Sequence, residues 1–99
     1  MKVLRGILRE SLVYYERLER DLAHRLGKLP RGSVKRRRLK GRVYYYLQQR
    51  QGVKVIHRYL GSREPKELMT AIQQRRMLKQ ELTKVRAALK LLPRRKLAP

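Results

Sequence analysis

The sequence predicts an α+β fold in the order helix, three antiparallel strands, helix. Three observations predict it. Apolar residues recur at helical spacing over 7–27 and again over 63–92. The segment 33–60 alternates instead, is rich in β-branched and aromatic residues, and contains two glycine turns. All seven acidic residues lie outside that central segment. A chain of 99 residues has room for one domain, 1–99, which ends in a basic tail at 93–99.

The first helix is predicted from a single apolar stripe between residues 7 and 27. Its members are three or four residues apart, which places them on one face of an α-helix. Gly27 provides a stop, and Pro30 shortly beyond it prevents continuation. The stripe consists of Leu8, Leu12, Tyr15, Leu18, Leu22 and Leu26.

Three short strands are predicted from VKRRRL, RVYYYLQQR and VKVIHRYL. Lys40 and Gly41 form the first turn, and Gln51 and Gly52 form the second, because glycine adopts the positive φ of tight hairpins. The three strands would form an antiparallel meander.

The second helix is predicted over 63–92. Ser62 can cap it, Pro65 is tolerated in its first turn, and Pro93 ends it. At 1.5 Å per residue such a helix is about 43 Å long, longer than three strands can cover. Its distal half therefore needs another partner, which is either the first helix in an antiparallel hairpin or a helical dimer contact.

The charge of the chain indicates a polyanionic partner. Lys and Arg number 28 against seven Asp and Glu, which gives a formal net charge of +21. Residues 22–63 contain thirteen of these cations and no acid. Because such a segment repels itself, a nucleic acid, DNA or RNA, is the partner that explains it most simply.

Catalysis and metal binding are not expected. Cysteine is absent, and His24 and His57 are isolated from each other in the sequence, so a metal centre is not indicated. The carboxylates lie outside the sheet and are explained as helix caps or intrahelical partners. We therefore expect a non-enzymatic protein without a cofactor. No signal peptide or membrane span is indicated, and a cytoplasmic location is expected.

Alternation on the central strand assigns two faces to the predicted sheet. Val43, Tyr45 and Leu47 are expected to face the core under the second helix, together with Val34, Val55 and Tyr59. The polar face, joined by the rest of the basic run, gives the candidate nucleic-acid-binding residues: Lys35, Arg36, Arg37, Arg38, Lys40, Arg42, Tyr44, Tyr46, Gln48, Arg50, Lys54 and Arg58.

Lys and Arg would neutralise phosphates, while tyrosine would stack on an exposed base or donate its hydroxyl. Arg and Gln side chains in a duplex groove would read base edges instead. Equally, the tyrosines are explained as ordinary β-forming residues that pack under a helix. The pattern leaves these alternatives open.

The segment LPRGSVKRRRLKGRVYYYLQQRQGVKVIHRYLG resembles a group of short basic proteins of bacteria and mobile elements. The group shares a glycine-serine start, a basic strand, a tyrosine-rich strand, a GK-type turn and a closing Tyr-aliphatic-Gly. The order of three strands and a helix also resembles the AP2-like amino-terminal DNA-binding domain of tyrosine integrases. That resemblance implies nucleic acid on the exposed face of the sheet, although here a long helix precedes the sheet.

The leading functional hypothesis is a nucleic-acid-binding protein that uses the basic, tyrosine-rich sheet. One alternative is a small phage or mobile-element accessory or inhibitor that docks on a nucleoprotein effector, with the helices contacting a protein partner or a second copy. Another is a ribosomal-type structural RNA-binding protein. Membrane-surface binding ranks last, because the most basic segment is a predicted strand rather than an amphipathic helix.

Overall fold

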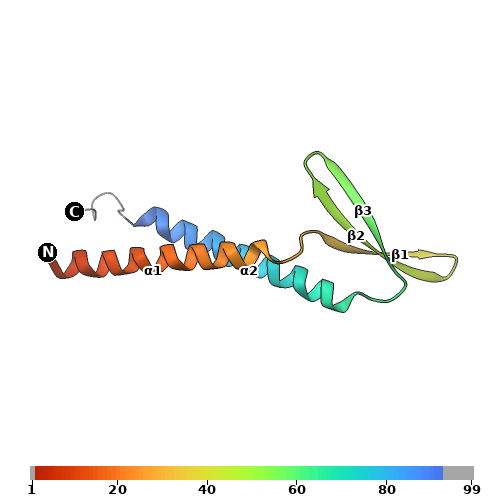
Figure 1. Cartoon of the computed structure of the whole chain (residues 1–99), viewed down its shortest axis with the longest axis horizontal. Coiled ribbons are helices and arrows are strands. Elements are labelled where there is room, and N and C mark those ends of the chain that lie inside the picture. The colour runs from red at the N-terminus through yellow and green to blue at the C-terminus, as the bar shows by residue number, and fades with distance from the viewer. Residues whose placement is uncertain (1, 93–99) are drawn as a thin grey trace. The chain divides into compact units, whose positions relative to one another are not determined.

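The computed structural model describes residues 2–92, and its elements follow the predicted order helix, three strands, helix (Figure 1). The predicted α+β fold is therefore confirmed, whereas the predicted basic tail lies outside the described residues. The elements are α1 (Lys2–Gly27), β1 (Ser33–Leu39), β2 (Arg42–Gln51), β3 (Lys54–Gly61) and α2 (Lys66–Leu91).

The chain forms two compact units. One unit is Leu29–Arg76, which contains the whole sheet and the first turns of α2. The other contains α1 and the part of α2 that begins at Met77. The second helix therefore contributes to both units.

The helical unit is an antiparallel hairpin of α1 and the distal part of α2 (Figure 1). Its core consists of Leu22 from α1 and Leu82, Val85 and Leu89 from α2, each less than a tenth exposed. The apolar stripes predicted on the two helices therefore cover each other within one chain. Further apolar side chains pack around this core: Leu12, Tyr15, Leu18, Leu26, Leu78 and Leu92.

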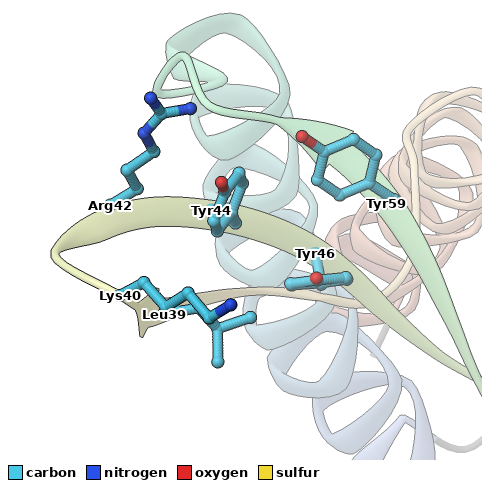
Figure 2. A pocket seen from close by; sticks show the side chains of 6 residues that line it. All are labelled: Leu39, Lys40, Arg42, Tyr44, Tyr46 and Tyr59. Carbon is cyan, nitrogen blue, oxygen red and sulfur yellow. The ribbon is translucent and has the colours of Figure 1, made fainter.

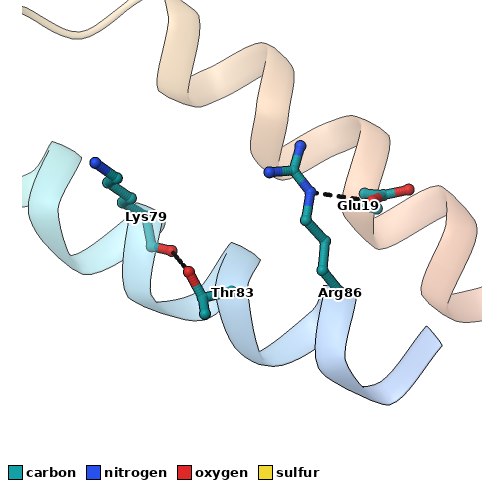
Figure 3. Close-up of polar contacts among 4 residues, drawn as sticks. All are labelled: Glu19, Lys79, Thr83 and Arg86. Carbon is teal, nitrogen blue, oxygen red and sulfur yellow. Dashed lines mark hydrogen bonds and ion pairs between the residues drawn. The ribbon is translucent and has the colours of Figure 1, made fainter. Parts of the chain in front are cut away.

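Polar contacts on the hairpin lie at its surface (Figure 3). Arg86 Nε donates a hydrogen bond of 3.2 Å to Glu19 Oε2, which joins the two helices. Thr83 donates its hydroxyl to the Lys79 carbonyl, 2.9 Å away and one turn earlier in α2. Exposed ion pairs of this kind contribute about 0–1 kcal/mol to stability. The apolar core is therefore the main source of the stability of the hairpin.

Both helices begin at positions other than those predicted. α1 begins at Lys2 rather than at residue 7, because Leu4 extends the apolar stripe by one turn and Gly6 costs a helix only about 1 kcal/mol relative to alanine. α2 begins at Lys66 rather than at residue 63, and its first bond runs from the Met69 N–H to the Pro65 carbonyl, 2.9 Å apart. The ring of Pro65 disfavours helical backbone at the residue before it. The predicted cap at Ser62 is therefore wrong.

The three strands form one antiparallel sheet with β2 in the centre. Leu39 pairs with Arg42 across the predicted Lys40–Gly41 turn, where φ is 50° and 79°. Those positive values are typical of a two-residue type I′ hairpin. In the second hairpin Gln51 still pairs with Lys54, so the turn residues are 52–53 rather than the predicted 51–52. A bulge interrupts the pairing of β2 with β3 between Tyr45 and Tyr46.

Strand pairing corrects the predicted faces of β3. The two residues that flank the two-residue turn, Gln51 and Lys54, differ by three, so each pair before the bulge joins an odd-numbered residue to an even-numbered one. Val55 pairs with Arg50, and Tyr59 pairs with Tyr46. Both therefore lie on the polar face of β2, and the prediction that they belong to the core with Leu47 is wrong. Val34 pairs with Leu47, as that prediction requires.

Gly32 allows the segment before β1 to approach β2 closely. Its φ is 120°, a conformation that residues with a side chain rarely adopt. A Cβ at this position would lie 2.6 Å from the Gln48 carbonyl oxygen and 3.1 Å from Leu47 Cδ1. The Gln49 amide also donates a 2.8 Å hydrogen bond to the Arg31 carbonyl. These contacts fix the start of β1 against the Leu47 face of the sheet.

Candidate functional site

Three tyrosines gather on one face of the sheet (Figure 2). Tyr44 and Tyr46 alternate on β2, and Tyr59 on β3 is the pairing partner of Tyr46. The ring centroid of Tyr59 is 6.1 Å from that of Tyr44 and 5.5 Å from that of Tyr46. The planes are tilted by 50° and 57°, which is within the usual geometry of attractive aromatic pairs. We call this surface the tyrosine face.

Cationic side chains from β1 and the first turn accompany these rings. Arg37 pairs with Tyr44, and its guanidinium carbon lies 5.4 Å from the centroid of the Tyr46 ring. That distance is typical of a cation–π contact. Lys35 pairs with Tyr46 in the same ladder. The strand pairing thus places positive charge directly beside aromatic surface.

A hollow of about 640 Å³ lies at the turn end of the tyrosine face (Figure 2). Aromatic rings line it together with an aliphatic side chain and two cations from the first hairpin. Its surroundings therefore suit a flat aromatic group that carries negative charge. The lining residues are Leu39, Lys40, Arg42, Tyr44, Tyr46 and Tyr59.

The predicted binding residues lie in three places: the tyrosine face, the first turn and the opposite face of the sheet. Seven share the tyrosine face through their positions in the ladder: Lys35, Arg37, Arg42, Tyr44, Tyr46, Gln48 and Arg50. Lys40 lies in the turn and lines the hollow. Pairing places the remaining four, Arg36, Arg38, Lys54 and Arg58, on the opposite face.

The strand pairing of β2 with β3 explains why two predicted binding residues lie on the other face of the sheet. Lys54 pairs with Gln51 and Arg58 with Leu47, so the prediction that they share a face with Tyr44 and Tyr46 is wrong. Tyr59, which the sequence pattern assigns to the core, lies on the tyrosine face instead. The two-residue length of the second turn was the signal that would have found it.

The opposite face of β2 is the packed one. Leu47 is 3% exposed, whereas Tyr59 on the tyrosine face is 57% exposed. Val43 and Tyr45, which alternate with Tyr44 and Tyr46, are half-buried. The assignment of Val43, Tyr45 and Leu47 to one face, away from Tyr44 and Tyr46, is confirmed by the ladder.

The strands that form the tyrosine face contain no acidic residue. Within residues 2–92 no group of three or more His, Asp or Glu side chains could hold a metal ion. Glu64 and Glu67, the carboxylates nearest in sequence to the sheet, follow β3 rather than lie within it. The described part of the chain also has no helix long and apolar enough to cross a membrane.

Comparison with known proteins identifies a family for this chain. Searches of curated proteins and of solved structures give no match. A family model described as a domain of unknown function, DUF6788, matches residues 5–70. The matched segment includes most of α1, the whole sheet and the start of α2. Because it exceeds half of the 99 residues, the chain belongs to the DUF6788 family of domains of unknown function.

Proposed function

We propose that this protein is a non-enzymatic nucleic-acid-binding protein whose tyrosine face contacts the sugar-phosphate backbone. One observation carries the proposal: the sheet joins three tyrosines and several cations on one face, within a segment, 22–63, that has no acidic residue. A surface that served only solubility would mix charges of both signs.

Phosphate neutralisation supplies the affinity in this proposal. Cations that displace condensed counter-ions from a nucleic acid gain free energy from the release of those ions into solution. Lys35, Arg37, Lys40 and Arg42 are the cations nearest to the tyrosines in the strand ladder and the turn. The tyrosines then add stacking or hydrogen bonds to the same ligand.

Salt dependence tests the proposal. Fluorescence anisotropy of a labelled 20-nucleotide strand and of a duplex of the same length would be followed from 50 to 400 mM NaCl. Contacts from four cations predict a slope of log affinity against log salt of about −3.6 for the duplex and about −2.8 for the single strand. A flat response, or no binding at the lowest salt concentration, would contradict the proposal.

A second candidate function is an accessory or inhibitor that docks on a nucleoprotein effector. The leucine stripes of the two helices do not favour it, because they cover each other in the hairpin. Apolar side chains at the start of α1 do favour it: Val3 is 76% exposed, Leu4 54% and Ile7 55%. Co-purification with a large nucleoprotein, combined with weak binding to naked nucleic acid, would distinguish this function from the first.

A further inference from the structure

We propose that the tyrosine face binds single-stranded nucleic acid and that one unpaired base enters the hollow at the first hairpin. This inference rests on the proposed function and specifies its ligand. Single-stranded DNA and RNA share the required chemistry, an exposed aromatic base between charged phosphates.

The ring of Tyr59 offers the largest stacking surface of the three. Tyr46 already has the Arg37 guanidinium 5.4 Å from its centroid and the Tyr59 ring at 5.5 Å. Tyr44 and Tyr46 are half-buried, whereas Tyr59 is 57% exposed. A base that enters the hollow therefore stacks chiefly on Tyr59, with Tyr44 beside it.

The hollow has the size and the lining of a site for a small aromatic group. Its volume of about 640 Å³ lies within the range of about 300–1,000 Å³ that is usual for small-molecule sites. Leu39 and the rings supply apolar surface, while Lys40 and Arg42 supply charge (Figure 2). Because Lys40 lies in the turn and Arg42 directly follows it at the start of β2, both are placed to contact the phosphates that flank an inserted base.

A duplex would not use these features. In a duplex every base is stacked between neighbours, so its flat surfaces are closed to a tyrosine ring. A strand that reads a duplex groove presents Arg, Gln or Asn to base edges. Here the rings of Tyr44, Tyr46 and Tyr59 line the hollow, whereas Gln48, whose register partners are Ser33 and His57, lies further along β2 and is not part of the lining.

The test measures how tightly the full chain binds three kinds of ligand of equal length. These are a 12-nucleotide single strand, made as DNA and as RNA, an abasic strand with the same phosphates, and a duplex. Affinities would be measured at one salt concentration. We expect the abasic strand to bind about tenfold more weakly than the intact strand, because stacking by a single base has an effect of about this size. We expect the duplex to bind more weakly than the intact strand as well.

Variants assign the effect to the tyrosine face. Tyr59→Leu removes the ring and should reduce affinity for the intact strand about tenfold while leaving the abasic strand unchanged. Tyr59→Phe keeps the ring and should bind as the unmodified chain does. Tyr14→Leu is the matched control, because Tyr14 lies on α1 and is 61% exposed, close to the value for Tyr59. It should leave both affinities unchanged.

The outcomes separate this inference from the proposed function. Equal, salt-dependent binding of the intact strand, the abasic strand and the duplex would overturn the inference and leave a phosphate-binding protein. Equal losses for Tyr59→Leu and Tyr14→Leu would also overturn it. Absence of binding to every ligand at low salt would overturn the proposed function and the inference together. The abasic comparison uses the unmodified chain, so a folding defect in a variant cannot obscure the result.

Discussion

Gly32 occupies a backbone position that other residues cannot adopt without strain. Its φ of 120° lies in a region that is open mainly to glycine, and the Gln48 carbonyl lies where a side chain would begin. The sequence GS before a basic strand gave no indication of this close approach, because the approach depends on where β2 lies. Tertiary contacts of this kind cannot be predicted from local pattern alone.

Gly32→Ala should therefore destabilise the fold. Strained backbone costs about 1–3 kcal/mol, and the Cβ contact of 2.6 Å with a carbonyl oxygen adds to that cost. We expect a loss of about 3 kcal/mol in the free energy of unfolding, measured by urea denaturation. Gly6→Ala is the control, because no atom lies within 4 Å of its added Cβ, and in a helix it should stabilise by about 1 kcal/mol. A Gly32→Ala variant as stable as the original would contradict the described approach.

Truncation of Leu22 tests the core of the helical hairpin in the same way. It is 2% exposed within the cluster that joins α1 to α2, so Leu22→Ala should cost about 2–5 kcal/mol, measured by thermal or urea unfolding. Leu91→Ala serves as its control, because Leu91 is 86% exposed and its truncation should change stability by less than about 0.5 kcal/mol. Similar effects of the two changes would show that the hairpin core is not formed as described.

At the scale of elements, the sequence predicted those features that depend on local pattern. The apolar stripes placed both helices, and the Lys40–Gly41 turn correctly set which side chains of β1 share a face with Tyr44. The prediction for β3 is wrong because the apolar character of Val55 and Tyr59 does not by itself place them in the core. Aromatic and aliphatic residues on an exposed face mislead such an assignment, whereas the odd-to-even pairing set by a two-residue turn does not.

Side chains alternate between the two faces of the sheet along β1, which allows a direct test of which face would bind nucleic acid. Lys35 and Arg37 lie on the tyrosine face, while Arg36 and Arg38 lie on the opposite face of the same strand. The double change Lys35→Gln with Arg37→Gln should weaken nucleic-acid binding and reduce the salt slope by about 1–2. Arg36→Gln with Arg38→Gln removes the same charge and should have a smaller effect in the same anisotropy measurement. A larger effect of the second pair would place the binding surface on the Leu47 face.

At the scale of the whole chain, charge is segregated along the sequence. The seven acidic residues lie before position 22 or after position 63, and the two ion pairs described, Arg25 with Asp21 and Arg86 with Glu19, are both in the helical unit. Positive charge in the sheet thus has no acidic residue in its own segment to offset it. Long-range attraction from a net charge of +21 would nevertheless draw the entire chain towards any polyanion.

Local binding and overall charge can be separated by variants with equal net charge. Arg37→Gln with Arg42→Gln, and Lys84→Gln with Lys90→Gln on α2, each lower the net charge from +21 to +19. If the tyrosine face makes the contacts, the first pair should reduce affinity about tenfold or more at 150 mM salt, and the second should reduce it by less than about threefold. The first pair should also change the dissociation rate, whereas a loss of long-range attraction changes mainly the association rate. Equal losses for both pairs, confined to association, would mean that the chain binds through its total charge and that the sheet has no special part in binding.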